Sequence, residues 1–264
     1  MSIEVSPGAA HDAKATVTEG RRLWKTVDRP NLLVKVPGTV AGAEAVRQLI
    51  ADGINVNVTL LFAIAAHDRV IDAYISGLED RVKKGLPVDR LASVASFFVS
   101  RVDTEIDKRL DGLNKPDLKG RAAVANAKLA YQLFVERFSS PRWKALEAKG
   151  ARVQKPLWAS TSTKNPAYRD VMYVEQLIGP RSINTMPPQT LVATKDHGDV
   201  HRTVDQNVDQ ATRDLAQLET AGVSMKDVTD TLLVEGLASF QKSFDSLIAG
   251  LEKKRGLVSA GTRS

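Results

Sequence analysis

The sequence predicts an α/β protein built on a parallel sheet, and two observations support this prediction. Short apolar segments alternate with longer amphipathic segments from end to end, which is the pattern of β-α-β units. Polar residues stand at or just after the ends of the expected strands, at Lys35, Asn57, Ser96 and Ser160. In a (β/α)₈ barrel the carboxyl edge carries the active site, whereas an open sheet gathers ligand contacts at one switch point. We therefore expect a barrel that forms a single domain over residues 1–264.

The expected elements follow from the apolar period and from turn residues. Strands are expected at 2–5, 31–36, 54–58, 92–99, 152–159 and 182–185. Helices are expected at 10–27, 41–51, 62–84, 101–110, 119–137, 141–149, 167–178, 203–221 and 225–253, and a frayed tail at 254–264. A barrel needs eight strands. The strands seen here are therefore expected to be the third to the eighth, with the first two β/α units missing from this chain.

Composition limits the kinds of function. In the 264 residues, apolar and charged fractions of 43% and 26% are ordinary for a globular protein. No apolar run approaches the ~20 residues that span a bilayer, no signal peptide opens the chain, and cysteine is absent. We expect a cytoplasmic protein without disulfides or thiolate metal sites and without a membrane partner. The net charge of +6, from 37 basic and 31 acidic residues, is scattered. Small anions such as phosphates are therefore favoured over nucleic acid.

Lys35 ends an apolar run in the second expected strand, just before a turn at Pro37 and Gly38. Lysine is almost never fully buried without a partner. This one either extends to solvent or is held for its chemistry, because a desolvated neutral amine can attack a carbonyl and form a Schiff base.

Three polar residues alternate with apolar ones in the third expected strand. Asn55, Asn57 and Thr59 therefore share one face. A solvated edge strand would explain them, but asparagine is rare in strands and the neighbouring residues look buried. We expect a row of amide and hydroxyl groups that lines a barrel mouth.

Three further residues are candidates for the site. Arg101 begins a helix, where backbone amides and a guanidinium can bind a phosphate together. Lys164 lies in a hydroxyl-rich loop that could also hold a phosphate, or that is an ordinary capped loop. Glu4 lies in the first expected strand, where it is either a solvated carboxylate or a proton carrier acting through water near Lys35.

Metal and nucleotide chemistry are not expected. His197 and His201 are four residues apart and could share a helix face, but Gly198 weakens that helix and no third ligand is evident. No phosphate loop, dinucleotide fingerprint or nucleophile elbow occurs in the sequence. We expect no metal and no cofactor.

Four blocks together resemble the transaldolases, which are class I aldolase-type TIM-barrel enzymes of the non-oxidative pentose phosphate pathway. The blocks are IEVS at 3–6, LVKVPGT at 33–39, GINVNVTLLF at 53–62 and SFFVSR at 96–101. The resemblance runs to about residue 253, and WASTSTKNP at 158–166 is similar to the longer bacterial branch.

The resemblance implies roles for the candidate residues. Lys35 would be the Schiff-base nucleophile, and Glu4 with Thr59 would handle a catalytic water. Asn57 and Ser96 would bind hydroxyls of the dihydroxyacetone unit.

The resemblance also implies phosphate-binding residues and a reaction. Arg101 would hold the substrate phosphate, and Lys164 lies where many relatives carry a second arginine. The expected reaction moves a dihydroxyacetone unit from sedoheptulose 7-phosphate to glyceraldehyde 3-phosphate. Fructose 6-phosphate and erythrose 4-phosphate are the further donor and acceptor. A fructose-6-phosphate aldolase and a non-catalytic sugar-phosphate-binding fragment are the alternatives, and the oligomeric state is left open.

Two family features have no match in this sequence. The family's general acid/base aspartate and its Thr-Ser-Asn-Pro-like block belong to the first two barrel strands. An open arc of strands exposes edges and an apolar interior. We expect the polypeptide expressed alone to be unstable or to aggregate, and to be catalytically impaired.

Overall fold

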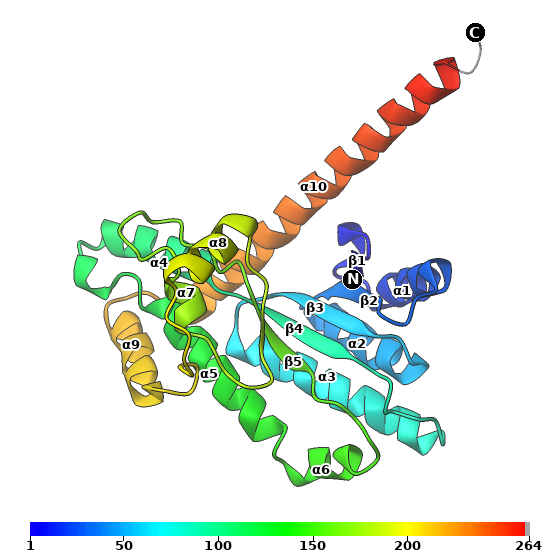
Figure 1. The fold of residues 1–264 in the computed structure, drawn as a ribbon, viewed down its shortest axis with the longest axis horizontal. Helices are drawn as coiled ribbons and strands as arrows, with labels where there is room; N and C mark the ends of the chain where they lie inside the picture. The colour runs from blue at the N-terminus through cyan, green and yellow to red at the C-terminus, as the bar shows by residue number, and fades with distance from the viewer. Residues whose placement is uncertain (262–264) are drawn as a thin grey trace.

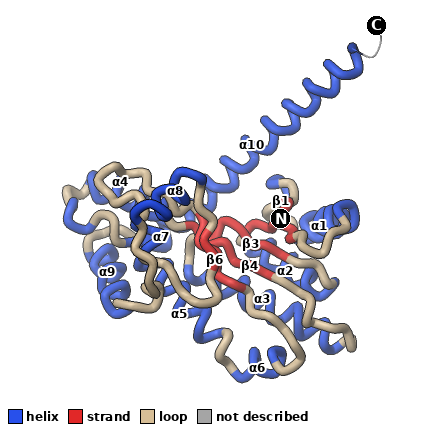
Figure 2. The backbone as a smooth tube through the Cα atoms, in the orientation of Figure 1, coloured by secondary structure: helices blue, strands red, loops and turns tan. Residues whose placement is uncertain are grey.

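Six parallel strands form one sheet in their order along the chain (Figures 1 and 2). The computed structural model describes residues 1–261. The strands are β1 (Ser2–Glu4), β2 (Leu33–Pro37), β3 (Val56–Leu61), β4 (Ser93–Phe98), β5 (Lys155–Ala159) and β6 (Ile183–Asn184). Every neighbouring pair is parallel. The order never reverses, so the sheet has no switch point and follows the strand sequence of a β/α barrel. This confirms the expected fold class.

Helices connect the strands. They are α1 (Ala13–Val27), α2 (Val40–Asp52), α3 (Ile64–Lys83), α4 (Ser100–Gly112), α5 (Ala122–Arg137), α6 (Pro141–Glu147), α7 (Met172–Glu175), α8 (Pro188–His197), α9 (Val208–Thr220) and α10 (Met225–Gly261), with short 3₁₀ turns η1 (Pro7–Ala9) and η2 (Pro116–Leu118). α2 contacts β2 and β3, and α3 contacts β3 and β4. Each of these two helices therefore covers a pair of adjacent strands, as crossover connections of one hand require.

One helix prediction was wrong, and one helix was not predicted. The helix expected over 167–178 is only the single turn α7, because the preceding segment is held in a turn. There the Asn165 side chain accepts a hydrogen bond from the Ala167 amide at 2.9 Å, and the Tyr168 hydroxyl bonds to Asp107. α8 was not predicted, because its only buried residue is Thr190 and it has no apolar stripe to detect.

Helix α10 begins against the body of the protein and then projects away from it (Figure 1). It approaches β3 closely, since a Cβ on Gly236 would lie 2.9 Å from the Leu60 side chain. Phe240 still packs against the core, whereas Leu247 and Leu251 are exposed. The helix continues to Gly261 through most of the tail expected to fray, and residues 262–264 of that tail lie outside the described part.

Asp103 is a buried carboxyl that joins two helices to the segment after β5. Its side chain on α4 accepts hydrogen bonds from the Ala123 amide and from the Tyr173 hydroxyl, both at 2.8 Å. The first of these bonds caps α5, whose own N-cap residue, Arg121, makes no side-chain cap. Burial raises the pKa of Asp103 to about 6, despite both hydrogen bonds.

His67 is a buried imidazole whose pKa is shifted down, whereas that of Asp103 is shifted up. Its side chain is fully buried on α3, and neither ring nitrogen has a hydrogen-bond partner among the described residues. The ring packs 5.7 Å from the ring of Phe97. Burial lowers the pKa of His67 to about 4, because the charged imidazolium loses its hydration there.

These two groups are expected to give opposite slopes of stability against pH. The folded state holds the Asp103 proton more tightly than the unfolded state, so this contribution is lost as pH rises from about 4 to about 6. The folded state resists protonation of His67, so this contribution is lost as pH falls from about 6.5 to about 4. Each group changes the free energy of unfolding by about 3 kcal/mol over its full pH range. Because the two changes have opposite sign over nearly the same range, the free energy of unfolding of the unsubstituted chain depends little on these two groups as pH changes.

Denaturant unfolding between pH 4.5 and 7 of two variants tests this. Asp103→Asn should gain stability with rising pH relative to the parent, because only the His67 slope remains. His67→Leu should lose stability with rising pH relative to the parent, because only the Asp103 slope remains. Variants that both follow the parent's pH dependence would contradict the assignment.

Candidate active site

Glu4, Lys35 and Asn57 form a row across three neighbouring strands. Glu4 pairs with Lys35 in the register of β1 and β2, and Lys35 pairs with Asn57 in the register of β2 and β3. Residues in register on adjacent parallel strands point to the same side of the sheet. The three side chains therefore share one face, and the valines that flank Lys35, Val34 and Val36, are fully buried on the other.

Lys35, Asn57 and Ser96 lie within their strands and not at the strand ends. The expected position at the carboxyl edge was wrong for Lys35, Asn57 and Ser96, because β2, β3 and β4 continue past them to Pro37, Leu61 and Phe98. Glu4 is the last residue of β1, and Ser160 directly follows β5. In a barrel this face of the sheet is the interior.

Lys35 is paired. Its Nζ lies 3.4 Å from Oε2 of Glu4, and each of the two side chains is 26% exposed. The ammonium also lies 5.5 Å from the ring centroid of Phe240 on α10. Among the described residues these are its two partners. Lys35 is therefore neither fully buried nor without a partner.

Glu4 has the properties of a proton-transfer group. Burial raises the pKa of its carboxyl above the ordinary value, even though the Lys35 ammonium acts in the opposite direction. Its second oxygen, Oε1, is buried and has no hydrogen-bond partner among the described residues. A carboxyl with one unpaired oxygen can bind a water or a substrate hydroxyl without losing another bond.

Asn57 and Ser96 are held together by hydrogen bonds. The Ser96 hydroxyl donates to Oδ1 of Asn57 at 2.7 Å, and Nδ2 of Asn57 donates to the Ser2 hydroxyl at 3.2 Å. Both side chains are buried. The chain of bonds fixes the Asn57 amide beside the Lys35–Glu4 pair.

Asn55 does not belong to this group, which corrects the expected row of three. It precedes β3, and its amide donates to the carbonyls of Pro30 and Leu32 at 3.2 and 3.0 Å. Its Oδ1 accepts from the Ala92 amide at 2.9 Å. Asn55 therefore joins the loops before β2 and β4, which gives its buried amide a structural function.

Thr59 is buried where β3 becomes irregular. Its carbonyl accepts a hydrogen bond from the Gly38 amide at 2.7 Å, and its hydroxyl makes no hydrogen bond among the described residues. The next residue, Leu60, has a φ of 57°, and the register with β4 shifts between Val58 and Leu61. Such bulges change the direction of side chains and are common beside active sites.

Of the two predicted phosphate-binding residues, Arg101 lies at the start of a helix and Lys164 lies in an exposed loop. Arg101 is the second residue of α4, as expected, with its guanidinium 5.2 Å from the Phe98 ring centroid. Lys164 is exposed in the loop after β5 and donates to the Ser162 hydroxyl at 2.8 Å. The structure gives no contact between Lys164 and the Lys35–Glu4 pair.

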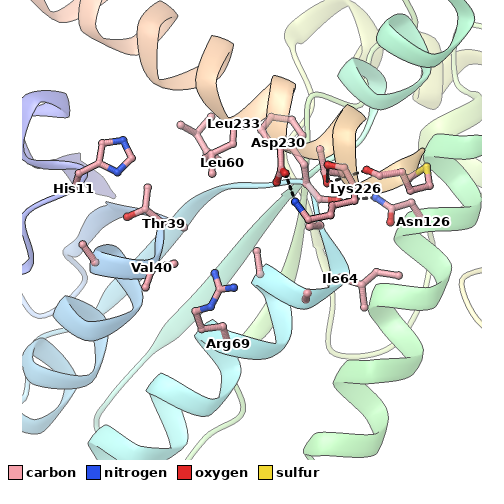
Figure 3. Close-up of a pocket in the computed structure, with 18 of the residues that line it drawn as sticks. His11, Thr39, Val40, Leu60, Ile64, Arg69, Asn126, Lys226, Asp230 and Leu233 are labelled. Carbon is pink, nitrogen blue, oxygen red and sulfur yellow. Dashed lines mark hydrogen bonds and ion pairs between the residues drawn. The ribbon is translucent and has the colours of Figure 1, made fainter. Parts of the chain in front are cut away.

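A cavity of about 810 Å³ is separate from this face. Its walls include residues of β3, of the turn after β2, and of α2, α3, α5, α9 and α10. Thr39, Arg69 and Asn126 are among them (Figure 3). It is largely apolar, and neither Lys35 nor Glu4 lines it. We place the candidate active site at Lys35 and Glu4 and not at this cavity, because the amine and the carboxyl can carry out chemistry that an apolar cavity cannot.

Metal ligation was considered at two histidines. α8 ends at His197, and Gly198 leaves the helix with a φ of −73° and a ψ of 134°. His197 and His201 therefore do not share a helix face, so that alternative is wrong. In residues 1–261 no group of three or more His, Cys, Asp or Glu side chains could hold a metal ion.

Sequence reasoning missed two contacts of the site. Phe240 belongs to the apolar period of α10, but the sequence gives no sign that it reaches Lys35 from 205 residues away. Ser2 was assigned only to a strand, and its bond to Asn57 depends on the pairing of three strands. Alternation within β1 places Ser2 and Glu4 on the same face, which is the only signal that pointed there.

Sequential parallel strands, with a lysine–carboxylate pair on the face opposite α2 and α3, are typical of β/α-barrel enzymes. Residues 1–251 match the family model described as Transaldolase/Fructose-6-phosphate aldolase, and the chain belongs to this family.

Relatives named transaldolase are closely similar. The protein of Acidothermus cellulolyticus is 51% identical over 256 residues, which cover 96% of this chain and 69% of the relative. That of Frankia alni is 48% identical over 260 residues, or 97% of this chain and 70% of the relative. A protein named Transaldolase 2 in Streptomyces avermitilis is 48% identical over 256 residues, or 96% and 69%. The chain is thus a transferase of the transaldolase type. None of the helices described here has the length and apolar character to cross a bilayer.

Proposed function

We propose that this enzyme transfers a dihydroxyacetone unit through a Schiff base on Lys35. The donors are sedoheptulose 7-phosphate and fructose 6-phosphate, the acceptors are glyceraldehyde 3-phosphate and erythrose 4-phosphate, and the pathway is the non-oxidative pentose phosphate pathway. One observation carries the proposal. Lys35 sits beside a carboxyl with a raised pKa, on a half-buried face that also holds fixed hydroxyl and amide groups.

The reaction needs an amine nucleophile and an electron sink. The neutral amine of Lys35 attacks the C2 carbonyl of the ketose, and loss of water from the carbinolamine gives a protonated imine. The C4 hydroxyl gives its proton to a water as the C3–C4 bond breaks, and the protonated imine accepts the electron pair of that bond. This leaves a neutral enamine and releases the first aldose phosphate. The enamine then adds to the acceptor aldehyde, whose oxygen takes a proton from water, and this restores the imine. Hydrolysis frees the new ketose and Lys35.

Glu4 and Thr59 are proposed to handle the water of these steps. Formation and hydrolysis of the imine each require a proton to move to or from an oxygen next to Nζ. Glu4 touches Nζ and has an unpaired oxygen, so it can pass that proton through a water. Thr59 follows Asn57 by two residues and has a hydroxyl that is not engaged by other described residues.

Asn57 and Ser96 are proposed to bind hydroxyls of the dihydroxyacetone unit. The Ser96–Asn57–Ser2 chain already orients the amide. A fixed amide binds a hydroxyl without having to be ordered first, which lowers the cost of substrate binding.

Arg101 is proposed to bind the substrate phosphate, and Lys164 to assist from the loop after β5. Arg101 lies in the first turn of α4, where helix amides also favour an anion, and it has no ion-pair partner among the described residues. Arg101→Ala should raise KM for fructose 6-phosphate by about 10- to 100-fold, the scale of one or two lost charge-assisted hydrogen bonds.

Free dihydroxyacetone separates phosphate binding from chemistry. It has no phosphate, so its trapping on Lys35 by borohydride should be unchanged in Arg101→Ala. Arg213→Ala on α9, which removes an exposed arginine bonded to Gln210, is the matched control. If Arg101→Ala weakened the reaction of fructose 6-phosphate and of free dihydroxyacetone equally, Arg101 would support the fold and would not bind the phosphate.

The family description also contains fructose-6-phosphate aldolase, which is the second candidate. Turnover of fructose 6-phosphate with and without erythrose 4-phosphate separates the two. A transaldolase consumes about one equivalent of donor per chain without an acceptor and turns over many times with one. Repeated turnover that releases dihydroxyacetone without an acceptor would instead identify an aldolase.

A further inference from the structure

Phe240 reaches the proposed site from a distant part of the chain. Its ring centroid lies 5.5 Å from the Lys35 Nζ, and its side chain is partly buried against the core. The close approach of Gly236 to Leu60, one turn earlier on α10, fixes the helix at this position. The contact therefore belongs to a packed helix and not to a surface side chain that swings freely.

An aromatic ring face attracts cations and has no such attraction for neutral groups. The proposed reaction, on which this inference rests, alternates between a cationic and a neutral nitrogen on Lys35. The protonated imine carries the positive charge before cleavage. The enamine, which receives the electron pair of the broken C3–C4 bond, is neutral at the same nitrogen. A ring held over this atom stabilises the first state relative to the second.

We propose that Phe240 is a positioning residue that sets the balance between the imine and the enamine on Lys35. Nζ lies over the Phe240 ring, 5.5 Å from the centroid, and Oε2 of Glu4 lies 3.4 Å from the same atom. Glu4 moves protons, whereas Phe240 only favours the charged state. Without an acceptor, C3 of the enamine takes a proton from water and gives the three-carbon imine. Phe240 would favour this cation, which is the form that water hydrolyses and borohydride reduces.

Ring fluorination tests this without changing the packing. Mono-, di- and trifluorophenylalanine at position 240 keep the ring shape and progressively weaken its attraction for cations. After cleavage of fructose 6-phosphate without an acceptor, borohydride measures the imine and hexacyanoferrate oxidation measures the enamine. We expect the imine-to-enamine ratio to fall stepwise, by about 5- to 10-fold over the series, as expected for a half-buried cation–π contact.

Natural substitutions give a second test. Phe240→Leu should lower the ratio, Phe240→Tyr should keep it within about 2-fold, and Phe244→Leu, one turn further on α10, should leave it unchanged. A ratio that stays constant across the fluorinated series while the adduct still forms would overturn the inference. Absence of any adduct in the unsubstituted enzyme would overturn the proposed function, and this inference with it.

Discussion

Lys35→Ala should abolish the borohydride-dependent adduct and lower transfer by about 10⁴-fold or more, the scale on which removal of an enzyme's nucleophile acts. Each later step takes place on a substrate that is joined to this nitrogen through its C2 carbon, so no partial reaction survives loss of the amine. Fructose 6-phosphate turnover and intact mass after borohydride measure the two effects. The substitution also removes the one ion-pair partner that Glu4 has within residues 1–261, so thermal unfolding is recorded in parallel.

Lys144→Ala is the matched control for this variant. Lys144 is exposed on α6 and pairs with Glu147, three residues further along the same helix. A surface pair of this kind contributes little to stability, so the control should retain full activity and a full adduct. An undiminished adduct in folded Lys35→Ala would remove Lys35 from the proposed role.

Glu4→Gln should lower transfer by about 10²- to 10³-fold, in the range of a lost general acid or base. Glutamine keeps the size of the side chain but cannot carry a proton between Nζ and water. The loss should fall on the formation and hydrolysis of the imine, so the adduct should form slowly but reach its full extent. Stopped-flow trapping at increasing times measures this difference.

Glu147→Gln, which removes the exposed partner of Lys144, controls for loss of a carboxylate elsewhere. If Glu4→Gln trapped the adduct at the parent rate, Glu4 would be only an electrostatic partner of Lys35. If the adduct were lost entirely, Glu4 would be needed to hold Lys35 in place.

The sequence was sufficient for the sheet and for part of the site. Every expected strand is present with small shifts at its ends, because buried parallel strands are short apolar runs bounded by turn residues. The alternation around Asn57 placed this residue on the correct face. Alternation gives the face of a residue but not its partner across the sheet.

Other features depend on contacts that no local pattern encodes. Asn55 has the same alternation as Asn57, but the loops beside it take up its amide. Leu60 adopts a left-handed backbone conformation that its residue type disfavours, at a bulge packed under Gly236. The contact of Phe240 with Lys35 depends on where α10 crosses the sheet, which only the assembled fold determines.

One measurement tests the central claim most directly. The unsubstituted enzyme is incubated with fructose 6-phosphate and borohydride, its intact mass is recorded, and its peptides are mapped. A single three-carbon adduct on the peptide that contains Lys35 is the expected result. An adduct on another lysine, or turnover by a folded enzyme that never yields an adduct, would contradict a Schiff-base mechanism at Lys35.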